Sequence, residues 1–156
     1  MYKVFVYASK MPLPIQFTVH TWIVTEHDEV RDRFDVLGFK EDRGIRHGYF
    51  YKNFLPPKMG CPVFSIGKWR LFEKRITWKT ELLYEIQGGV GSDAHKIYTL
   101  LHKDYKKIPI VNRFRLLIGP NCNSFTQWVL DYVAPKKYPL PLKAYGKGWH
   151  TKPIRS

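Results

Sequence analysis

The stretch that decides the fold is Gly119-Pro120-Asn121-Cys122-Asn123-Ser124-Phe125-Thr126-Gln127-Trp128-Val129-Leu130. Glycine followed by proline predicts a sharp turn, and the apolar spacing after the turn predicts a helix that ends at Pro135. The turn therefore delivers Cys122 to the first turn of a helix. Unpaired N–H groups and the helix dipole favour a thiolate there and can receive a developing oxyanion. Cys122 is for this reason a candidate nucleophile.

The two asparagines that flank Cys122 each have two candidate roles. Asn121 and Asn123 can cap the helix by accepting N–H bonds in its first turn, or their amides can donate to an oxyanion. The alternative for Cys122 is an inert, buried cysteine behind a capping asparagine, because free cysteine is among the most buried residue types. The sequence leaves these alternatives open.

A thiol nucleophile needs a base, and His20 is the best candidate among the six histidines. It lies in an apolar, β-branched segment, residues 17–25, on the same face as Trp22. A third group on an adjacent strand would orient the imidazole, and Asp35 fits that position better than the second choice, His47. The alternatives are a core histidine with an ordinary hydrogen bond and an Asp35 that faces solvent.

The rest of the chain predicts an α+β fold, with an antiparallel sheet and packed helices. Residues 33–39 predict a strand that pairs with residues 17–25 through a charged turn. Further strand-like segments are residues 48–54, 63–66, 68–78, 81–87 and 113–118. Residues 81–87 are equally compatible with a turn of helix. Ser92 or Asp93 predicts the start of an earlier helix, which Pro109 stops.

The length of 156 residues predicts one domain, residues 1–156, with an extended tail, residues 136–156, packed on its surface. Hydrophobic residues make up 44% of the chain, which excludes a disordered chain of low hydrophobicity. No apolar stretch approaches the ~18 residues that a spanning helix needs, and the N-terminal residues lack the continuous apolar region of a signal peptide. We therefore expect a soluble, cytoplasmic protein.

The formal net charge of +13 raises the affinity of the chain for polyanions such as nucleic acid. The basic residues are scattered rather than gathered in one block, and no helix-turn-helix, zinc-finger or RRM signature is present. The alternative is that the charge keeps a small, aromatic-rich protein soluble. The sequence leaves the oligomeric state open.

The chain has two cysteines, too few for a disulfide scaffold or a four-cysteine zinc site. They can form one bridge in an exported protein and are free thiols in a reducing compartment. Cys61 lies between Gly60 and Pro62 with no helix to activate it, so we interpret it as structural or incidental. His95 and His102 share a helix face without a further ligand, so no metal and no organic cofactor are expected.

The chain resembles an uncharacterised bacterial family in three places. The hallmarks of that family are a His-Thr-Trp strand, a Gly-Pro-Asn-Ser-Asn-Thr-Phe segment, and Leu-Pro-Pro with Gly-Lys-Asp near the C-terminus. The matching segments here are His20-Thr21-Trp22, Gly119 to Phe125, and Leu140-Pro141 with Ala144-Tyr145-Gly146-Lys147-Gly148-Trp149. The family usually has serine at the position of Cys122, so thiol chemistry is not a requirement of the whole family.

A wider similarity is to the circularly permuted papain-like group, which includes NlpC-like peptidases and lecithin retinol acyltransferases. In that group a histidine strand comes first and a cysteine helix comes last, as His20 and Cys122 do here. The resemblance implies that Cys122 is the nucleophile and His20 the base. No motif of the group fixes the third residue, so Asp35 rests on its predicted strand alone.

These observations favour a cysteine hydrolase or acyltransferase that acts on an amide, ester or thioester. Its substrate would be an acyl or peptide-like molecule attacked by Cys122, with His20 as base. The alternative is a non-catalytic basic module that binds nucleic acid or another polyanion, with aromatic side chains as stacking platforms. A third possibility is a degenerate enzyme that keeps the Cys–His pair in a sealed groove.

Overall fold

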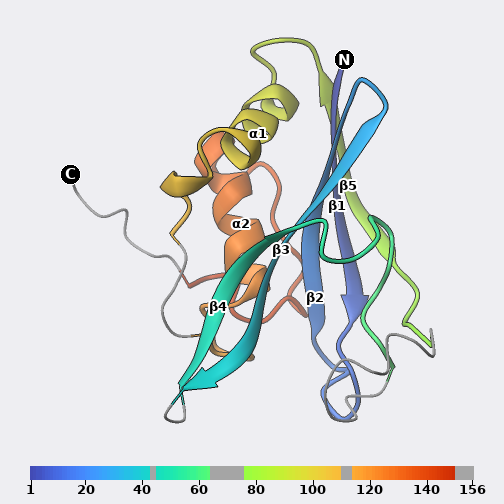
Figure 1. The fold of residues 1–156 in the computed structure, drawn as a ribbon, viewed down its shortest axis with the longest axis vertical. Helices are drawn as coiled ribbons and strands as arrows, with labels where there is room; N and C mark the ends of the chain where they lie inside the picture. Colours follow the sequence, from blue (N-terminus) through green and yellow to red (C-terminus); the bar gives the residue numbers. More distant parts are fainter. Residues whose placement is uncertain (43–44, 64–75, 110–113, 150–156) are drawn as a thin grey trace.

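A computed structural model describes residues 1–42, 45–63, 76–109 and 114–149. Its strands form one sheet with the order β4-β3-β2-β1-β5, in which every neighbouring pair is antiparallel (Figure 1). The strands are β1 (Tyr2–Lys10), β2 (Val19–His27), β3 (Val30–Asp42), β4 (Ile45–Lys52) and β5 (Glu81–Gly88). The helices are α1 (Asp93–His102), a short 3-10 turn (Tyr105–Lys107) and α2 (Cys122–Val133). The predicted α+β class with an antiparallel sheet is confirmed.

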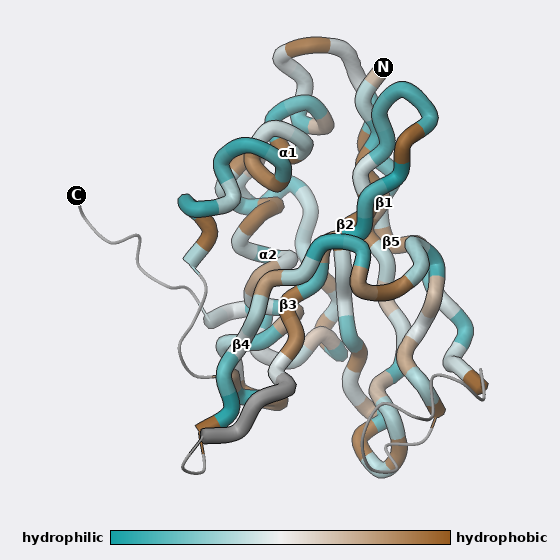
Figure 2. The backbone as a smooth tube through the Cα atoms, viewed as in Figure 1, coloured by the Kyte–Doolittle hydropathy of each residue, from teal (hydrophilic) through white to brown (hydrophobic). Residues whose placement is uncertain are grey.

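The strands predicted over residues 17–25 and 33–39 correspond to β2 and β3. They pair through the predicted charged turn, where Asp28 and Glu29 take positive φ values of 50° and 65°. This turn is hydrophilic in Figure 2. β1 was not predicted, although it lies between β2 and β5 in the sheet. Its apolar residues form one run from Val4 to Ala8, but the lysines at positions 3 and 10 and the prolines that follow the strand obscured that pattern.

Two other predictions are resolved by the structure. Residues 81–87 form β5, so their polar spacing belongs to a strand at the edge of the sheet. Residues 114–118 do not form the predicted strand, because the chain turns there and Arg115 N–H donates to Pro120 O at 2.9 Å. Most of the predicted strand over residues 68–78, and residues 64–66 of the one before it, lie outside the described residues.

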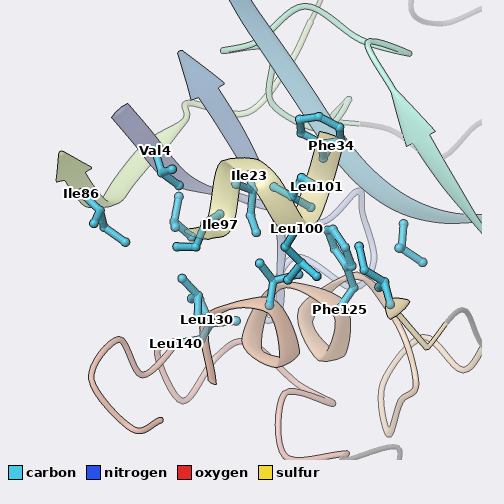
Figure 3. Close-up of a cluster of buried hydrophobic side chains, with 14 of the residues drawn as sticks. Val4, Ile23, Phe34, Ile86, Ile97, Leu100, Leu101, Phe125, Leu130 and Leu140 are labelled. Carbon is cyan, nitrogen blue, oxygen red and sulfur yellow. The ribbon is translucent and has the colours of Figure 1, made fainter. Parts of the chain in front are cut away.

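Both helices cover the same face of the sheet (Figure 1). α1 packs on β1 and β5, and α2 packs on β2 and β3. Figure 3 shows Ile23 and Phe34 of the sheet packed with Ile97 of α1 and Phe125 of α2 in this core. Because side chains alternate along a strand, the neighbours of Ile23 point to the opposite face, where Trp22 packs with Tyr7 in a smaller cluster. We call this face, opposite the helices, the outer face.

The segment after α2 contributes to the same core. Residues 136–149 form successive turns rather than a continuous extended stretch, and residues 150–156 lie outside the described residues. Leu140 is 2% exposed and Ala144 is fully buried, so the chain beyond α2 is part of the packed interior. Neither helix in the described ranges has the length and apolarity that crossing a bilayer requires.

Candidate active site

Asn121 caps the helix that begins at Cys122. Its Oδ1 accepts N–H bonds from Asn123 at 2.9 Å and Ser124 at 3.1 Å, and the Ser124 hydroxyl accepts the Asn121 N–H in return. This reciprocal arrangement is a capping box, which satisfies donors that the helix itself leaves unpaired. Asn121 Nδ2 donates to carbonyls of Leu116 and Tyr145, so both ends of the amide are engaged within the protein.

Asn123 fixes the first turn of α2 against the beginning of β2. Its Oδ1 accepts from Thr21 Oγ1 at 2.9 Å, and its Nδ2 donates to Val19 O at 2.9 Å. These two β2 residues are the chain neighbours of His20, so the bonds fix the start of α2 against this part of the strand, where the Cys122 thiol forms a hydrogen bond with His20. The Cys122 Sγ lies 3.7 Å from Asn123 Oδ1. The Asn121 side chain accepts from the N–H groups of Asn123 and Ser124, and the cap does not use the N–H of Cys122.

His20 and Asp35 form a buried pair on the outer face. His20 Nε2 lies 2.8 Å from Asp35 Oδ1, and the exposed fractions of the two residues are 4% and 0%. The ring of His20 also stacks on Trp22, with centroids 5.6 Å apart. Because Nε2 faces the carboxylate, Nδ1 is the nitrogen left for the thiol of Cys122.

Arg33 holds the carboxylate of Asp35 from the other side. Its Nε donates to Asp35 Oδ2 at 2.7 Å, and one terminal nitrogen donates to Oδ1 at 3.2 Å. The guanidinium is 1% exposed, lies 4.2 Å from the centre of the Trp22 ring, and donates to the carbonyls of Pro56 and Met59. The buried guanidinium requires these hydrogen-bond partners, because burying an ion without a partner costs roughly several kcal/mol.

The charges at this centre follow from its neighbours. Burial lowers the pKa of His20, but the charges of Cys122 and Cys61 and hydrogen bonds with Asp35 and Cys122 outweigh it and raise that pKa well above its usual value. Burial raises the pKa of Asp35, but the hydrogen bond and charge of His20, with the charge of Arg33, bring it below its usual value. The arrangement therefore favours an imidazolium between a carboxylate and a sulfur.

Cys61 lies beside the same histidine. Its N–H donates to Ser9 Oγ at 2.8 Å, and Ser9 is the direct partner of His20 across β1 and β2. Burial raises the pKa of the Cys61 thiol, while the charge of His20 and a hydrogen bond with Ser9 oppose the shift. Both cysteines are free in the structure. The interpretation of Cys61 as structural or incidental did not foresee its place beside His20.

Other candidates lie apart from the centre or lack ligands. His47 is in β4 opposite Lys40, and no described contact joins it to His20. His102 contacts Thr25 and Asp32 instead, with its Nε2 3.0 Å from Thr25 Oγ1. Within the described ranges, no three His, Cys, Asp or Glu side chains are grouped so that they could hold a metal ion.

A cavity of about 380 Å³ borders the same end of β1 and β2. Ser9 and Val19, the residues next to the centre, form part of its wall together with Trp78. The remaining lining residues are Ala8, Lys10, Lys79, Thr80, Glu81 and Lys143. Lys10 Nζ lies 5.2 Å from the centre of the Trp78 ring, and Lys143 forms an ion pair with Glu81 at 3.0 Å.

The sequence interpretation missed Arg33, which has no motif of its own. A signal was present, because Arg33 and Asp35 alternate with Phe34 and Val36 in one strand. In a strand covered on both faces, two opposite charges at alternate positions have to satisfy each other. Cys61 had no comparable signal, because its place beside His20 depends on the path of the chain after β4.

The chain belongs to the family described as a protein of unknown function (DUF3750), whose family model matches residues 1–149. The expectation of an uncharacterised family is thereby confirmed at this level. No curated protein and no solved structure shows a significant match to the chain.

Proposed function

We propose that this protein is a cysteine hydrolase or acyltransferase with a permuted papain-like arrangement, acting on an amide, ester or thioester. The observation that carries the proposal is the placement of His20, which lies between the carboxylate of Asp35 and the first turn of α2, where Cys122 begins the helix. The order of these parts, with the histidine strand before the cysteine helix, supports the papain-like arrangement.

In this mechanism the Cys122 sulfur attacks the carbonyl carbon of the substrate, and its proton is held on His20 Nδ1. The oxygen of the tetrahedral intermediate takes a negative charge, which the Cys122 N–H stabilises at the positive end of α2. The carbon–heteroatom bond then breaks as His20 returns the proton to the leaving group. The product of this half-reaction is an acyl group on Cys122.

In the second half-reaction a water molecule or an acceptor nucleophile attacks the acyl group. His20 removes its proton and returns it to the sulfur, which restores the thiol. Asp35 keeps the imidazole in one orientation and stabilises its charged form, and Arg33 keeps Asp35 ionised. The cavity beside Ser9 and Val19 has room for the acyl part of a small substrate.

The experiment follows acylation of the purified protein by p-nitrophenyl acetate and by S-phenyl thioacetate, using intact-mass spectrometry. We expect one added acetyl group on Cys122 in the wild type and in Cys61→Ser, and none in Cys122→Ala. His20→Gln should slow the acylation about 100-fold, within the usual range for loss of a general base. Equal acylation of wild type and Cys122→Ala would overturn the proposal.

A second measurement separates an active centre from a sealed one. Cys122 is 4% exposed, so reagents have to reach its sulfur through the surrounding side chains. Iodoacetamide should alkylate Cys122 at least about tenfold faster than Cys61 at pH 7, because only Cys122 combines a helix N-terminus with the imidazole. If Cys122 reacts only after the protein is unfolded, the pair is a structural relic and the enzymatic proposal fails.

A further inference from the structure

The segment between β4 and Cys61 crosses the outer face above the candidate site. In Figure 1 it is the green stretch that follows β4 and passes in front of β3 and β2. Three of its carbonyls are fixed there: Arg33 donates to Pro56 O at 2.8 Å and Met59 O at 2.6 Å, and Trp22 Nε1 donates to Pro57 O at 2.9 Å. The segment is thus attached to the side chains that flank His20 and Asp35.

The segment brings Cys61 next to His20, and α2 brings Cys122 next to the same histidine. Cys61 is held by its N–H bond to Ser9, the strand partner of His20. Cys122 is held by the bonds from Asn123 to Thr21 and Val19, the chain neighbours of His20. The chain has two cysteines in all, separated by 61 positions, and both interact with the imidazole of His20.

The two thiols differ in their surroundings. Burial raises the pKa of Cys61, with the charge of Cys122 contributing in the same direction. The Cys61 thiol therefore loses its proton less readily than an exposed cysteine does. This division of roles is the one that thiol–disulfide chemistry needs, with one sulfur that is oxidised first and a second that reacts with the oxidised product.

We propose that Cys61 is the resolving thiol of Cys122, and that a hydroperoxide converts the two into a reversible disulfide that switches the site off. The Cys122 sulfur attacks the distal oxygen of the hydroperoxide, the O–O bond breaks, and the alkoxide takes a proton from His20 to leave as an alcohol. Cys122 is now a sulfenic acid. The proposal shares its nucleophile with the proposed function but does not require that any acyl group be transferred.

The second step closes the bridge. His20 removes the proton of Cys61, whose sulfur attacks the Cys122 sulfur, forming the S–S bond and breaking the S–O bond. The hydroxide leaves as water with the proton from His20. The two thiols are oxidised by two electrons and the hydroperoxide is reduced to alcohol and water, so a dithiol reductant reverses the change. The sulfur that would attack a carbonyl is then consumed.

The test treats the wild type, Cys61→Ser and Cys122→Ser with hydrogen peroxide in the presence of dimedone, which traps sulfenic acids. The wild type should lose two hydrogens, yield the peptide that links residues 61 and 122, and return to the dithiol with dithiothreitol. Cys61→Ser should accumulate the dimedone adduct on Cys122 at least tenfold above the wild type. Cys122→Ser should keep Cys61 unmodified at the same dose.

Cys61→Ala repeats the comparison if the serine variant unfolds, and the thermal midpoint of each variant reports its folding. Equal dimedone labelling of wild type and Cys61→Ser, or disulfides formed only between molecules, would overturn the inference. If acylation of Cys122 occurs without the bridge, the proposed function stands and Cys61 has no resolving role. If the bridge forms in a protein that no ester acylates, the reverse conclusion holds.

Discussion

His20 Nε2 lies 2.8 Å from Asp35 Oδ1 at a point where the backbone pairing of their two strands has already ended. The register of β2 and β3 runs from His27–Val30 to Ile23–Phe34 and stops there. Beyond it the side chains of His20 and Asp35 join the two strands, and Arg33, in the same strand as Asp35, forms an ion pair with that carboxylate. The candidate site therefore occupies the gap that opens where the ladder ends.

Asp35→Asn should lower the free energy of unfolding by about 3 kcal/mol at pH 7, because it leaves the buried guanidinium of Arg33 without its counter-charge. Urea unfolding measures the loss.

The pKa of Asp35 is below its usual value in the folded protein, so its stabilisation is present above the unfolded pKa of ~3.9 and is lost as the pH falls through the folded pKa. The difference between variant and wild type should consequently shrink at pH 3. Asp104→Asn, at an exposed ion pair with Lys107, is the control and should unfold as the wild type does.

The imidazole of His20 should stay protonated above the usual histidine range near ~6.5. Burial works against this, but the charges of Cys122 and Cys61 and the bond with Asp35 raise its pKa. NMR titration of the ring, assigned with His20→Gln, measures the midpoint. Cys122→Ser should lower the midpoint more than Cys61→Ser, in the order of their effects on His20. A midpoint at or below the usual value in the wild type would contradict the ion-pair description.

Gly146→Ala should destabilise the protein by about 1–2 kcal/mol, the usual cost of a left-handed backbone for an L-residue. Gly146 has φ +84°, and a Cβ there would lie 2.4 Å from Asn121 Nδ2 in the helix cap. Gly148→Ala is the matched control, because a Cβ at that position meets nothing within 4 Å. Thermal and urea unfolding of both variants compare the two sites, and equal stability would show that the turn does not constrain the cap.

Arg33→Lys should cost about 2 kcal/mol of stability, because an ammonium cannot reproduce the forked bonds to Asp35 and the two carbonyls. Iodoacetamide should also alkylate Cys122 more slowly in this variant, since Asp35 and His20 lose their fixed geometry. Arg31→Lys is the control, two positions earlier in β3 and 46% exposed at its side chain. An Arg33 variant that loses stability but keeps the wild-type rate of alkylation would limit Arg33 to a structural role.

The parts of the fold that were predictable are those that local pattern determines. The apolar spacing after Asn121 and the β-branched run around His20 predicted α2 and β2, because each segment carries its own periodicity. β1 was not predicted because lysines at both ends make its apolar run look short. The turn at residues 114–118 was not predicted because the side-chain amide of Asn121, five and six positions later, donates to its carbonyls. Periodicity carries no information on such side-chain bonds.

The residues of the candidate site also divide into those that local pattern predicted and those that it did not. The sequence predicted three site residues, from a helix start, a strand and its neighbouring strand: Cys122, His20 and Asp35. The structure places His20 within hydrogen-bond distance of Asp35. Asn121 and Asn123 have their amide groups bonded within the protein, the first in the cap and the second to β2. Predicting Arg33 requires knowing which faces of the strands are buried, and predicting Cys61 requires knowing the path of the segment after β4.

The cap of α2 depends on residues that are translated after every helix and strand described. Asn121 donates to Tyr145 O, and Ser124 Oγ donates to Gly146 O, while His20 and Asp35 belong to strands made early. Domains generally fold as units, and the N-terminal part of a chain leaves the ribosome first. A nascent chain that has completed its sheet and α2 still lacks the carbonyls of Tyr145 and Gly146, which accept hydrogen bonds from the start of α2. Biosynthesis therefore delays a finished thiol centre until the segment beyond α2 has emerged, and a product truncated at residue 135 would contain all three nominated side chains around an unsecured helix.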